Sequence, residues 1–230
     1  MSKILALDTA TDACSVALNI DGAIVEEFAV VAREHTQRLL PMVTRVLDSQ
    51  NLSLHDLDAL AFTRGPGSFT GVRICLSVVQ GLAFGANLPV VPVSTLEAMA
   101  VGARRTMPQA QNRSLWVALD ARMGEVYWCS FDEHGKPGEE CVIAPEKLLD
   151  RPELWAQTSP SLALGPGWHY EELAGMKPDV IELECFPHAY DVAVLAAQLF
   201  ERGESVSAEL AQPVYLRDTV SWKKREKKRK

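Results

Sequence analysis

The sequence predicts an α/β fold made of two similar halves, each with a mixed β-sheet whose faces carry helices. Three apolar segments at the N-terminus have the pattern of strands, and helical and strand patterns alternate after them, a succession typical of a mixed sheet. A similar order of elements restarts near residue 115, and the tripeptide Gly-Pro-Gly at residues 65–67 returns at residues 165–167. We interpret these two recurrences as a faded duplication.

The first half opens with three predicted strands at residues 3–7, 13–20 and 23–31. Short hydroxyl and carboxylate side chains at residues 8–12 favour a turn between the first two strands. The dipeptide Asp-Gly at residues 21–22 is a strong signal for a two-residue hairpin between the second and third. We therefore expect three adjacent antiparallel strands.

A helix is predicted after these strands. Residues 34–50 place apolar side chains on one broad face, as an amphipathic helix does. Proline lacks the backbone donor that a helix interior needs, so Pro41 predicts either a kink or a helix that begins near Leu40. The next strand is the apolar run at residues 59–63.

The glycine-rich segment 65–71 separates that strand from a second helix at residues 72–86, which contains good helix formers and no proline. A short strand at residues 89–93 follows. Ser94 and Glu97 then form a capping box, which predicts a third helix to about residue 104.

The polar segment 107–114 has the composition of a boundary between the halves. We expect strands in the second half at residues 115–120, 125–131 and 140–143, an apolar run at 162–164, a closing helix at 189–202 and an ordered piece at 213–217. The predicted units are an N-terminal subdomain (1–106), a C-terminal subdomain (107–222) and a basic tail (223–230).

The composition is typical of a soluble acidic protein. The 230 residues carry a net charge of −7, and nearly half of them are hydrophobic. The five cysteines form no Cys-x-x-Cys pair, which favours reduced thiols in a cytoplasm. No basic-then-apolar leader begins the sequence, so we expect a cytoplasmic protein.

The charge is unevenly distributed. Residues 223–230 contain seven basic residues and one acidic residue, a local charge of +6, so the remaining 222 residues carry −13. Blocks of like charge are usually solvated and disordered, and this interpretation is favoured for the tail. The alternative is a weak electrostatic contact with tRNA or with a partner protein.

The glycine-rich loop is a candidate anion site, because it presents backbone N–H groups at the start of a helix. It lacks the lysine and hydroxyl that follow the last glycine of a phosphate-binding P-loop, since Gly71 precedes Val72 and Arg73. The glycine spacing is one residue too long for a dinucleotide fingerprint, and Pro66 stands where a hydrolase elbow needs glycine. A tight turn that leads into a buried helix is therefore the favoured interpretation.

The predicted helix at residues 72–86 is apolar around most of its circumference. Only Arg73, Ser77 and Gln80 are clearly polar, and they form one narrow stripe. Such a helix is buried on both sides, so one side is expected to face its own sheet and the other a neighbouring helix or another protein chain. The polar positions interrupt the apolar run, so we expect no membrane span.

Four segments resemble the TsaB (YeaZ) family of bacterial tRNA threonylcarbamoyladenosine biosynthesis proteins. They are KILALDTA at 3–10, RGPGSFTGVR at 64–73, DARMGEVY at 120–127 and YLR at 215–217. The resemblance extends through nearly the whole chain. It implies the duplicated mixed-sheet fold of the actin, sugar kinase and Hsp70 (ASKHA) superfamily.

The resemblance also implies a role in a tRNA-modifying complex. The family helps to place a threonylcarbamoyl group (t6A) on the adenosine beside the anticodon, in tRNAs that read codons beginning with adenine. The implied partners are the catalytic paralogue TsaD, the ATPase TsaE and, for the isolated chain, a second copy; tRNA is contacted indirectly or through the complex. Pairing through N-terminal helices makes the candidate interface residues His35, Leu39, Val43, Arg73, Leu76, Val79 and Gln80.

The catalytic relatives hold iron with two histidines four residues apart on the helix after the strand at 89–93. Thr95 and Met99 occupy these two positions here, and neither a neutral hydroxyl nor a soft thioether suits such a metal. The five histidines show no metal-ligand spacing elsewhere. We therefore expect a catalytically inactive paralogue, with no catalytic residues, no metal and no cofactor.

A residual nucleotide site is the remaining alternative. In superfamily ATPases an aspartate on the first turn approaches the Mg²⁺ of a nucleotide through water, which makes Asp8, Thr9, Gly67 and Ser68 candidates for ATP or ADP binding. Local capping of the turn is favoured, because no phosphate-binding cation accompanies them. The alternative function is a weak ATPase or an M22-like peptidase that uses Asp8 and the glycine loop.

Overall fold

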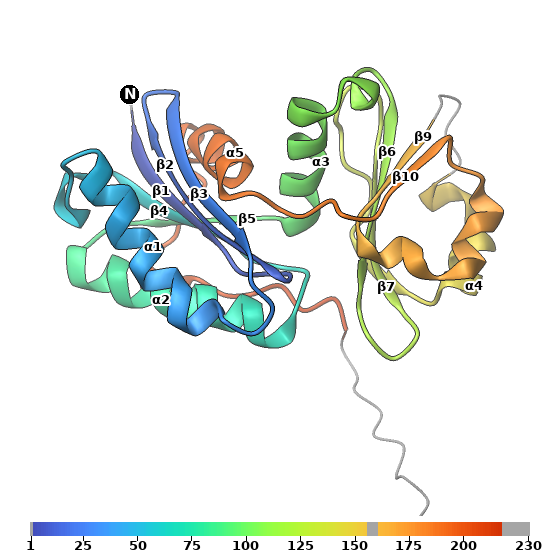
Figure 1. Cartoon of the computed structure of the whole chain (residues 1–230), viewed down its shortest axis with the longest axis horizontal. Helices are drawn as coiled ribbons and strands as arrows, with labels where there is room; N and C mark the ends of the chain where they lie inside the picture. The colour runs from blue at the N-terminus through green and yellow to red at the C-terminus, as the bar shows by residue number, and fades with distance from the viewer. Residues whose placement is uncertain (1, 156–160, 218–230) are drawn as a thin grey trace, which may run out of the picture.

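The computed structural model describes residues 2–155 and 161–217 as two α/β lobes that lie side by side (Figure 1). The first lobe contains a five-stranded sheet in the order β3-β2-β1-β4-β5. Its central strand β1 pairs antiparallel with β2 and parallel with β4. The strands are β1 (Lys3–Asp8), β2 (Ala13–Ile20), β3 (Ala23–Val30), β4 (Ala59–Thr63) and β5 (Val90–Val93).

The second lobe repeats this plan in the order β10-β9-β6-β7-β8. The central strand β6 pairs antiparallel with β7 and parallel with β9, as β1 does with β2 and β4. The strands are β6 (Ser114–Asp120), β7 (Val126–Phe131), β8 (Cys141–Ile143), β9 (Ser161–Leu164) and β10 (Val180–Glu182). The duplicated mixed-sheet fold predicted from the sequence is therefore confirmed.

Two long helices cover one face of the first sheet (Figure 1). Helix α1 (His35–Ser49) begins at His35, so the predicted start near Leu40 is wrong; Pro41 lies inside the helix. Helix α2 (Phe69–Ala86) begins three residues earlier than predicted, because the Ser68 hydroxyl accepts the N–H of Gly71 and caps the first turn.

Two further helices are α3 (Thr95–Thr106), which lies between the lobes, and α5 (Ala189–Glu201), which follows the second sheet in the chain but packs on the first. Helix α3 lies between the two sheets (Figure 1), and its apolar side chains pack with those of β6 in the second lobe. Helix α5 returns to the first sheet, on the face opposite α1 and α2. The strands of the first sheet thus come from residues 3–93 and those of the second from residues 114–182, whereas α5, which follows all of them, packs on the first sheet.

The second lobe contains shorter helical elements. They are η2 (Pro108–Ala110), α4 (Pro145–Leu149), η3 (Pro152–Leu154), η4 (Pro166–His169) and η5 (Glu171–Met176), with η1 (Leu54–Asp56) and η6 (Ala208–Leu210) outside it. After β9 the chain therefore forms a pair of 3₁₀ helices, η4 and η5. Tryptophans fill the core that these elements cover: the rings of Trp116 and Trp168 stack 6.1 Å apart.

The segment after α5 runs back along the first lobe. Val206 pairs with Val90 at the edge of the sheet, and the Val214 N–H donates to the carbonyl of Arg64 at 2.8 Å. This segment therefore follows β5 and α2 before it reaches the second lobe at Arg217. The basic tail at residues 223–230 lies outside the described residues.

Candidate functional site

The glycine-rich loop packs tightly against the turn that follows β1. The Ser68 N–H donates to the carbonyl of Ala10 at 2.7 Å, and the Thr9 hydroxyl donates to the carbonyl of Gly71 at 2.7 Å. A Cβ atom on Gly71 would lie 2.0 Å from the Thr9 carbonyl oxygen. Glycine is therefore required here by backbone contact within the chain, as the tight-turn interpretation predicted.

The four residues of the predicted nucleotide site lie in two segments that pack together, but only two of the four line a cleft. Asp8 and Thr9 are fully buried, whereas Gly67 and Ser68 line a cleft between the lobes. Asp8 lies on the same face of β1 as Ala6, which packs with α5, so its side chain is directed away from α2.

Asp8 makes hydrogen bonds within the chain. Its Oδ1 accepts from the Thr63 hydroxyl at 2.6 Å and from the Ala10 N–H at 3.1 Å, while its buried Oδ2 has no partner among the residues that the structure describes. Burial raises the pKa of Asp8 to about 7, although both hydrogen bonds favour the charged form. Both hydrogen bonds of this carboxyl thus join the end of β1 to β4 and to the turn that follows β1.

The cleft between the lobes has a volume of about 620 Å³. One wall is formed by Gly67 and Ser68 at the start of α2, and the other by residues at the ends of β6 and at η4. The C-terminal segment, with Tyr215 and Arg217, lines its mouth. A cavity of this size matches those that hold small ligands.

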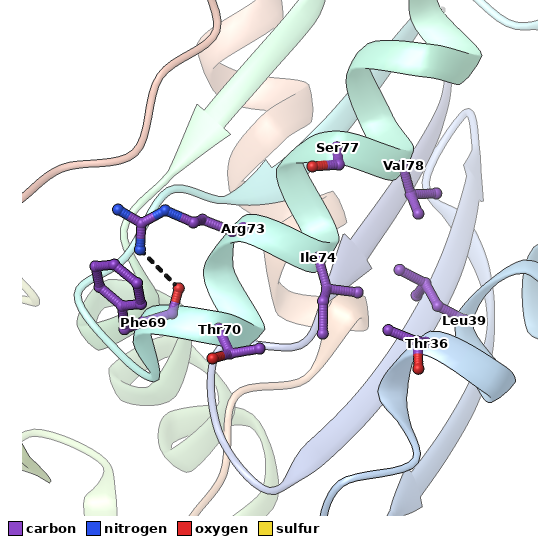
Figure 2. Close-up of a pocket in the computed structure, with 8 residues that line it drawn as sticks. All are labelled: Thr36, Leu39, Phe69, Thr70, Arg73, Ile74, Ser77 and Val78. Carbon is purple, nitrogen blue, oxygen red and sulfur yellow. Dashed lines mark hydrogen bonds between the residues drawn. The ribbon is translucent and has the colours of Figure 1, made fainter.

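A second hollow of about 370 Å³ lies between α1 and α2 (Figure 2). Apolar and hydroxyl side chains and one arginine line it. They are Thr36 and Leu39 from α1 and Phe69, Thr70, Arg73, Ile74, Ser77 and Val78 from α2. The hollow opens onto the outer face of α2, away from the sheet.

The outer face of α2 is open in this chain. Phe69 and Phe84 at its two ends are 69% and 72% exposed. The same face carries three small residues spaced four apart, Ser77, Gly81 and Gly85, and a Cβ atom on either glycine would meet nothing within 4 Å. Among the residues that the structure describes, none covers this broad face, which is the side that the sequence assigned to a neighbouring helix or another protein chain.

Most of the predicted interface residues lie inside the chain instead. Val43, Leu76 and Val79 pack in the core between the helices and the sheet, and Leu39 is 1% exposed. His35 is also buried. Its Nε2 lies within hydrogen-bond distance of the carbonyls of Thr11 and Ala13, at the start of β2. These five side chains are buried within the chain, because an apolar periodicity marks the core face first.

The other two predicted residues are partly exposed and already make contacts. Gln80 donates to the carbonyls of Ala208 and Ala211, both at 3.1 Å, and so fastens the C-terminal segment to α2. The Arg73 guanidinium lies over the ring of Phe69, 3.3 Å from its centroid. The open face is marked instead by three small residues, Ser77, Gly81 and Gly85, which the interface prediction from the sequence did not include.

The two positions that the resemblance equates with iron ligands are part of the core. Thr95 and Met99 are fully buried in the first turns of α3, and the Met99 methyl group packs against Gly165. The described residues contain no cluster of three histidine, cysteine or acidic side chains that could hold a metal ion.

Within residues 2–155 and 161–217, one helix is long and apolar enough to span a membrane by length and composition, namely α2, with 33% of it buried. The sequence predicts no membrane span here, because Arg73, Ser77 and Gln80 interrupt the apolar run. In this structure α2 packs along the sheet through Val72, Val79 and Ala83.

Comparison with known proteins identifies the family. Residues 22–163 match the family model described as TsaD, tRNA N6-adenosine threonylcarbamoyltransferase. The chain is 46% identical to the tRNA threonylcarbamoyladenosine biosynthesis protein TsaB of Escherichia coli, over 96% of this chain and 97% of that protein. It is also 42% identical to a tRNA N6-adenosine threonylcarbamoyltransferase of Nitrosomonas eutropha, over 33% of this chain and 22% of that enzyme.

A solved structure has the same fold. YeaZ from Pseudomonas aeruginosa superposes with a TM-score of 0.85 at 44% identity, over 94% of this chain and 100% of that one. The similarity to this structure and to the E. coli protein covers both lobes. The chain belongs to the TsaB family of tRNA threonylcarbamoyladenosine biosynthesis proteins.

Proposed function

We propose that this chain is a non-catalytic subunit of the complex that forms t6A on tRNA, and that it acts by docking the catalytic paralogue, TsaD, through the outer face of α2 and the hollow beside α1. The observation that carries the proposal is the open face itself. This apolar helix of 18 residues, only six of which are buried, exposes two phenylalanine side chains that the folding of one chain would be expected to cover.

The form of this surface suits another helix. Ser77, Gly81 and Gly85 lie one turn apart along its centre, so a partner backbone can approach closely. Phe69 and Phe84 flank this flat strip and provide apolar anchors at both ends. Loss of their exposed surface to water on docking favours association.

A related chain is the fitting occupant. The threonylcarbamoyltransferase match indicates that catalytic relatives contain a segment similar to part of this chain. Two related folds can present equivalent helices to one another across an approximate two-fold axis, as subunits do in symmetric dimers. The same surface would pair two copies when the catalytic partner is absent, and TsaE would join the assembled pair.

A non-catalytic role agrees with the chemistry of the candidate sites. The Asp8 carboxyl is used in internal hydrogen bonds, and the two positions equivalent to the iron ligands hold buried Thr95 and Met99. The α1–α2 hollow offers hydroxyl and apolar groups with a single guanidinium. These groups suit docking better than proton transfer.

Gly81→Arg tests the proposal. The new side chain would extend from a position where a Cβ atom meets nothing, so the monomer should keep its fold while the docking face is blocked. We expect loss of pairing by light scattering, alone and with the catalytic paralogue, and loss of t6A in cells that depend on the variant. Gln198→Arg, at an exposed position of α5 on the opposite face of the sheet, is the matched control.

Normal pairing and normal t6A levels with Gly81→Arg would contradict the proposed interface. ATP or peptide turnover by the isolated wild-type chain, lost on Asp8→Ala, would instead support the enzymatic alternative.

A further inference from the structure

A polar contact joins the two lobes at the N-terminal end of α3. The Ser94 hydroxyl donates to one oxygen of the Glu140 carboxylate, and the Arg64 guanidinium donates to the other oxygen at 3.3 Å. Arg64 and Ser94 directly follow β4 and β5 of the first sheet, whereas Glu140 directly precedes β8 of the second. We call these three side chains the clasp.

The clasp is largely shielded from solvent. The Arg64 side chain is 26% exposed and the Glu140 side chain 17% exposed. Salt and water screen such a pair less than a pair on the open surface. Removal of one partner leaves the other charge poorly compensated in a partly buried position. The clasp therefore favours the relative position of the lobes in which it can form.

Each half of the clasp is attached to one wall of the inter-lobe cleft. Arg64 begins the segment that contains Gly67, which lines the first-lobe wall. Glu140 is two residues from Val142, which pairs in register with Tyr127 of the second-lobe wall. A change in the clasp is therefore expected to change the separation of the two walls.

The connection from the first sheet to the second lies at the other end of α3. Helix α3 lies between the sheets (Figure 1) and leads into residues 107–113, which precede β6. At a rise of about 1.5 Å per residue, the 12 residues of α3 place the clasp about 18 Å from this connection. A few residues in a connection can absorb a rotation of one lobe against the other. Such a rotation is largest far from the connection, which is where the clasp lies.

A second negative charge lies beside the clasp. Glu97 is one turn along α3 from Ser94, whose hydroxyl accepts the Glu97 N–H at 3.2 Å. Burial raises the pKa of Glu97, and the charge of Glu140 raises this pKa further, whereas the charge of Arg64 lowers it. Two carboxylates thus compete for one guanidinium, and the repulsion between them weakens the clasp.

We propose that the clasp is a latch that sets the opening of the inter-lobe cleft, and that Glu97 opposes it so that the lobes can swing apart. One shielded ion pair and one opposing charge shift an equilibrium between two conformations that are close in free energy. With the latch closed, the cleft has a volume of about 620 Å³. Release of the latch separates the walls and admits a larger ligand. This latch is independent of the proposed docking through α2.

Pulsed electron paramagnetic resonance on the full-length protein tests the latch by measuring the distance between nitroxide labels on the two lobes. The labels are attached at two exposed positions, Asp48→Cys on α1 and Glu172→Cys on η5. Four of the native cysteines are buried, and burial raises the pKa of the fifth, Cys141, to about 11, so its thiol reacts slowly at neutral pH. The chain without the two introduced cysteines, taken through the same labelling, gives the background signal.

Glu140→Gln removes the charge that Arg64 holds. We expect the mean distance between the labels to shift by more than about 2 Å and the distance distribution to broaden. Arg64→Gln should give the same change, and the double variant should add nothing to it, because all three remove one contact. Glu97→Gln removes the opposing charge, so its distribution should be narrower than that of the parent chain.

Two further variants are matched controls. Glu139→Gln removes an equal charge from the exposed residue next to Glu140, and Asp179→Asn breaks an ion pair with Arg113 that lies within the second lobe. Neither should change the distance between the labels. Unfolding curves confirm that each variant is folded, and Ser94→Ala removes the other hydrogen bond of the clasp if Glu140→Gln does not fold.

Two results would overturn the inference. Unchanged distances in the folded clasp variants would mean that other contacts hold the lobes. An unchanged or broader distribution with Glu97→Gln would mean that Glu97 does not oppose the clasp. Both results leave the Gly81→Arg test of the docking face unaffected.

Discussion

The two lobes share a topology but use it differently. Each has a glycine at positive φ before a proline, Gly65 at 100° and Gly165 at 96°. In each, the second glycine of the loop lies against backbone: a Cβ on Gly67 would be 2.4 Å from the Ala10 oxygen, and one on Gly167 would be 2.6 Å from the Ala118 carbonyl carbon. The loops are therefore equivalent in packing.

The elements after the loops differ. In the first lobe the loop leads into the 18 residues of α2, whose outer face is open. In the second lobe it leads into two short 3₁₀ helices, η4 and η5, and the core beneath is filled by Trp116, Trp128 and Trp168. The second lobe thus covers its core with aromatic side chains, whereas the first leaves the outer face of α2 open, which is the face that we propose for docking.

The central strands end in the same way yet in different environments. Asp8 ends β1 and Asp120 ends β6, and each carboxylate accepts the N–H of the residue two positions later. Asp8 is fully buried, while the Asp120 side chain is 24% exposed at the cleft and paired with Arg122. The turn after the central strand is thus the same in both lobes, but the aspartate is buried within the first lobe and lies at the cleft in the second.

The largest expected effect tests whether the loops are equivalent. Gly71→Ala places a methyl group 2.0 Å from the Thr9 oxygen, which belongs to backbone and cannot move aside. We expect a loss of more than about 4 kcal/mol in the free energy of unfolding, measured in urea. Gly67→Ala and Gly167→Ala should each cost a similar amount if the two loops pack alike.

Gly81→Ala is the control for these variants, because its methyl group meets open space in a helix. We expect it to raise stability by about 1 kcal/mol. A tolerated Gly167→Ala beside a disruptive Gly67→Ala would break the comparison between the lobes.

The second effect concerns the two aspartates. The pKa of Asp8 is about 7 in the folded chain, above its unfolded value of 3.8. The carboxyl therefore favours folding fully below about pH 4, and this contribution is lost as the pH rises towards 7. Asp8→Asn mimics the protonated form, so its stability relative to wild type should increase over this window and level off near about 4 kcal/mol.

Thermal and urea unfolding between pH 4 and pH 8 measure this difference. Asp120→Asn is the matched control, because the partly exposed, ion-paired Asp120 has no buried charge to relieve, and it should give no gain that grows with pH. A pH-independent difference for Asp8→Asn would contradict the assignment of a buried, protonated group.

Much of the fold could be predicted because its signals are local. The alternating strands, the Asp-Gly hairpin at residues 21–22 and the glycine loop each carry their own signature in the sequence. Recurrence of the Gly-Pro-Gly tripeptide indicated the duplication, which the two sheets confirm. The resemblance of the quoted segments identified the family, which the E. coli relative confirms.

The remainder depends on contacts between distant segments. The return of α5 to the first sheet and the path of the C-terminal segment over Gln80 carry no local signature. Apolar periodicity also cannot separate a core face from a docking face, so the sequence assigns Leu76 and Val79 to the interface although they face the sheet. The open face is marked by Ser77, Gly81 and Gly85, whose small size is informative only once their exposure is known.

The smallest expected effect tests the connection between the lobes. Arg217 is 19% exposed and reaches Glu125 across the cleft, and it follows Val214, whose N–H is bonded to Arg64 of the first lobe. Arg217→Gln should cost about 1 kcal/mol or less in global stability, because partly exposed ion pairs contribute little. The segment should nevertheless loosen locally, so hydrogen exchange at the Val214 amide should accelerate while that at the central strand residue Leu5 stays unchanged. Unchanged exchange at Val214 would mean that the first lobe alone holds the segment, and that the two lobes are linked through α3 rather than through the C-terminus.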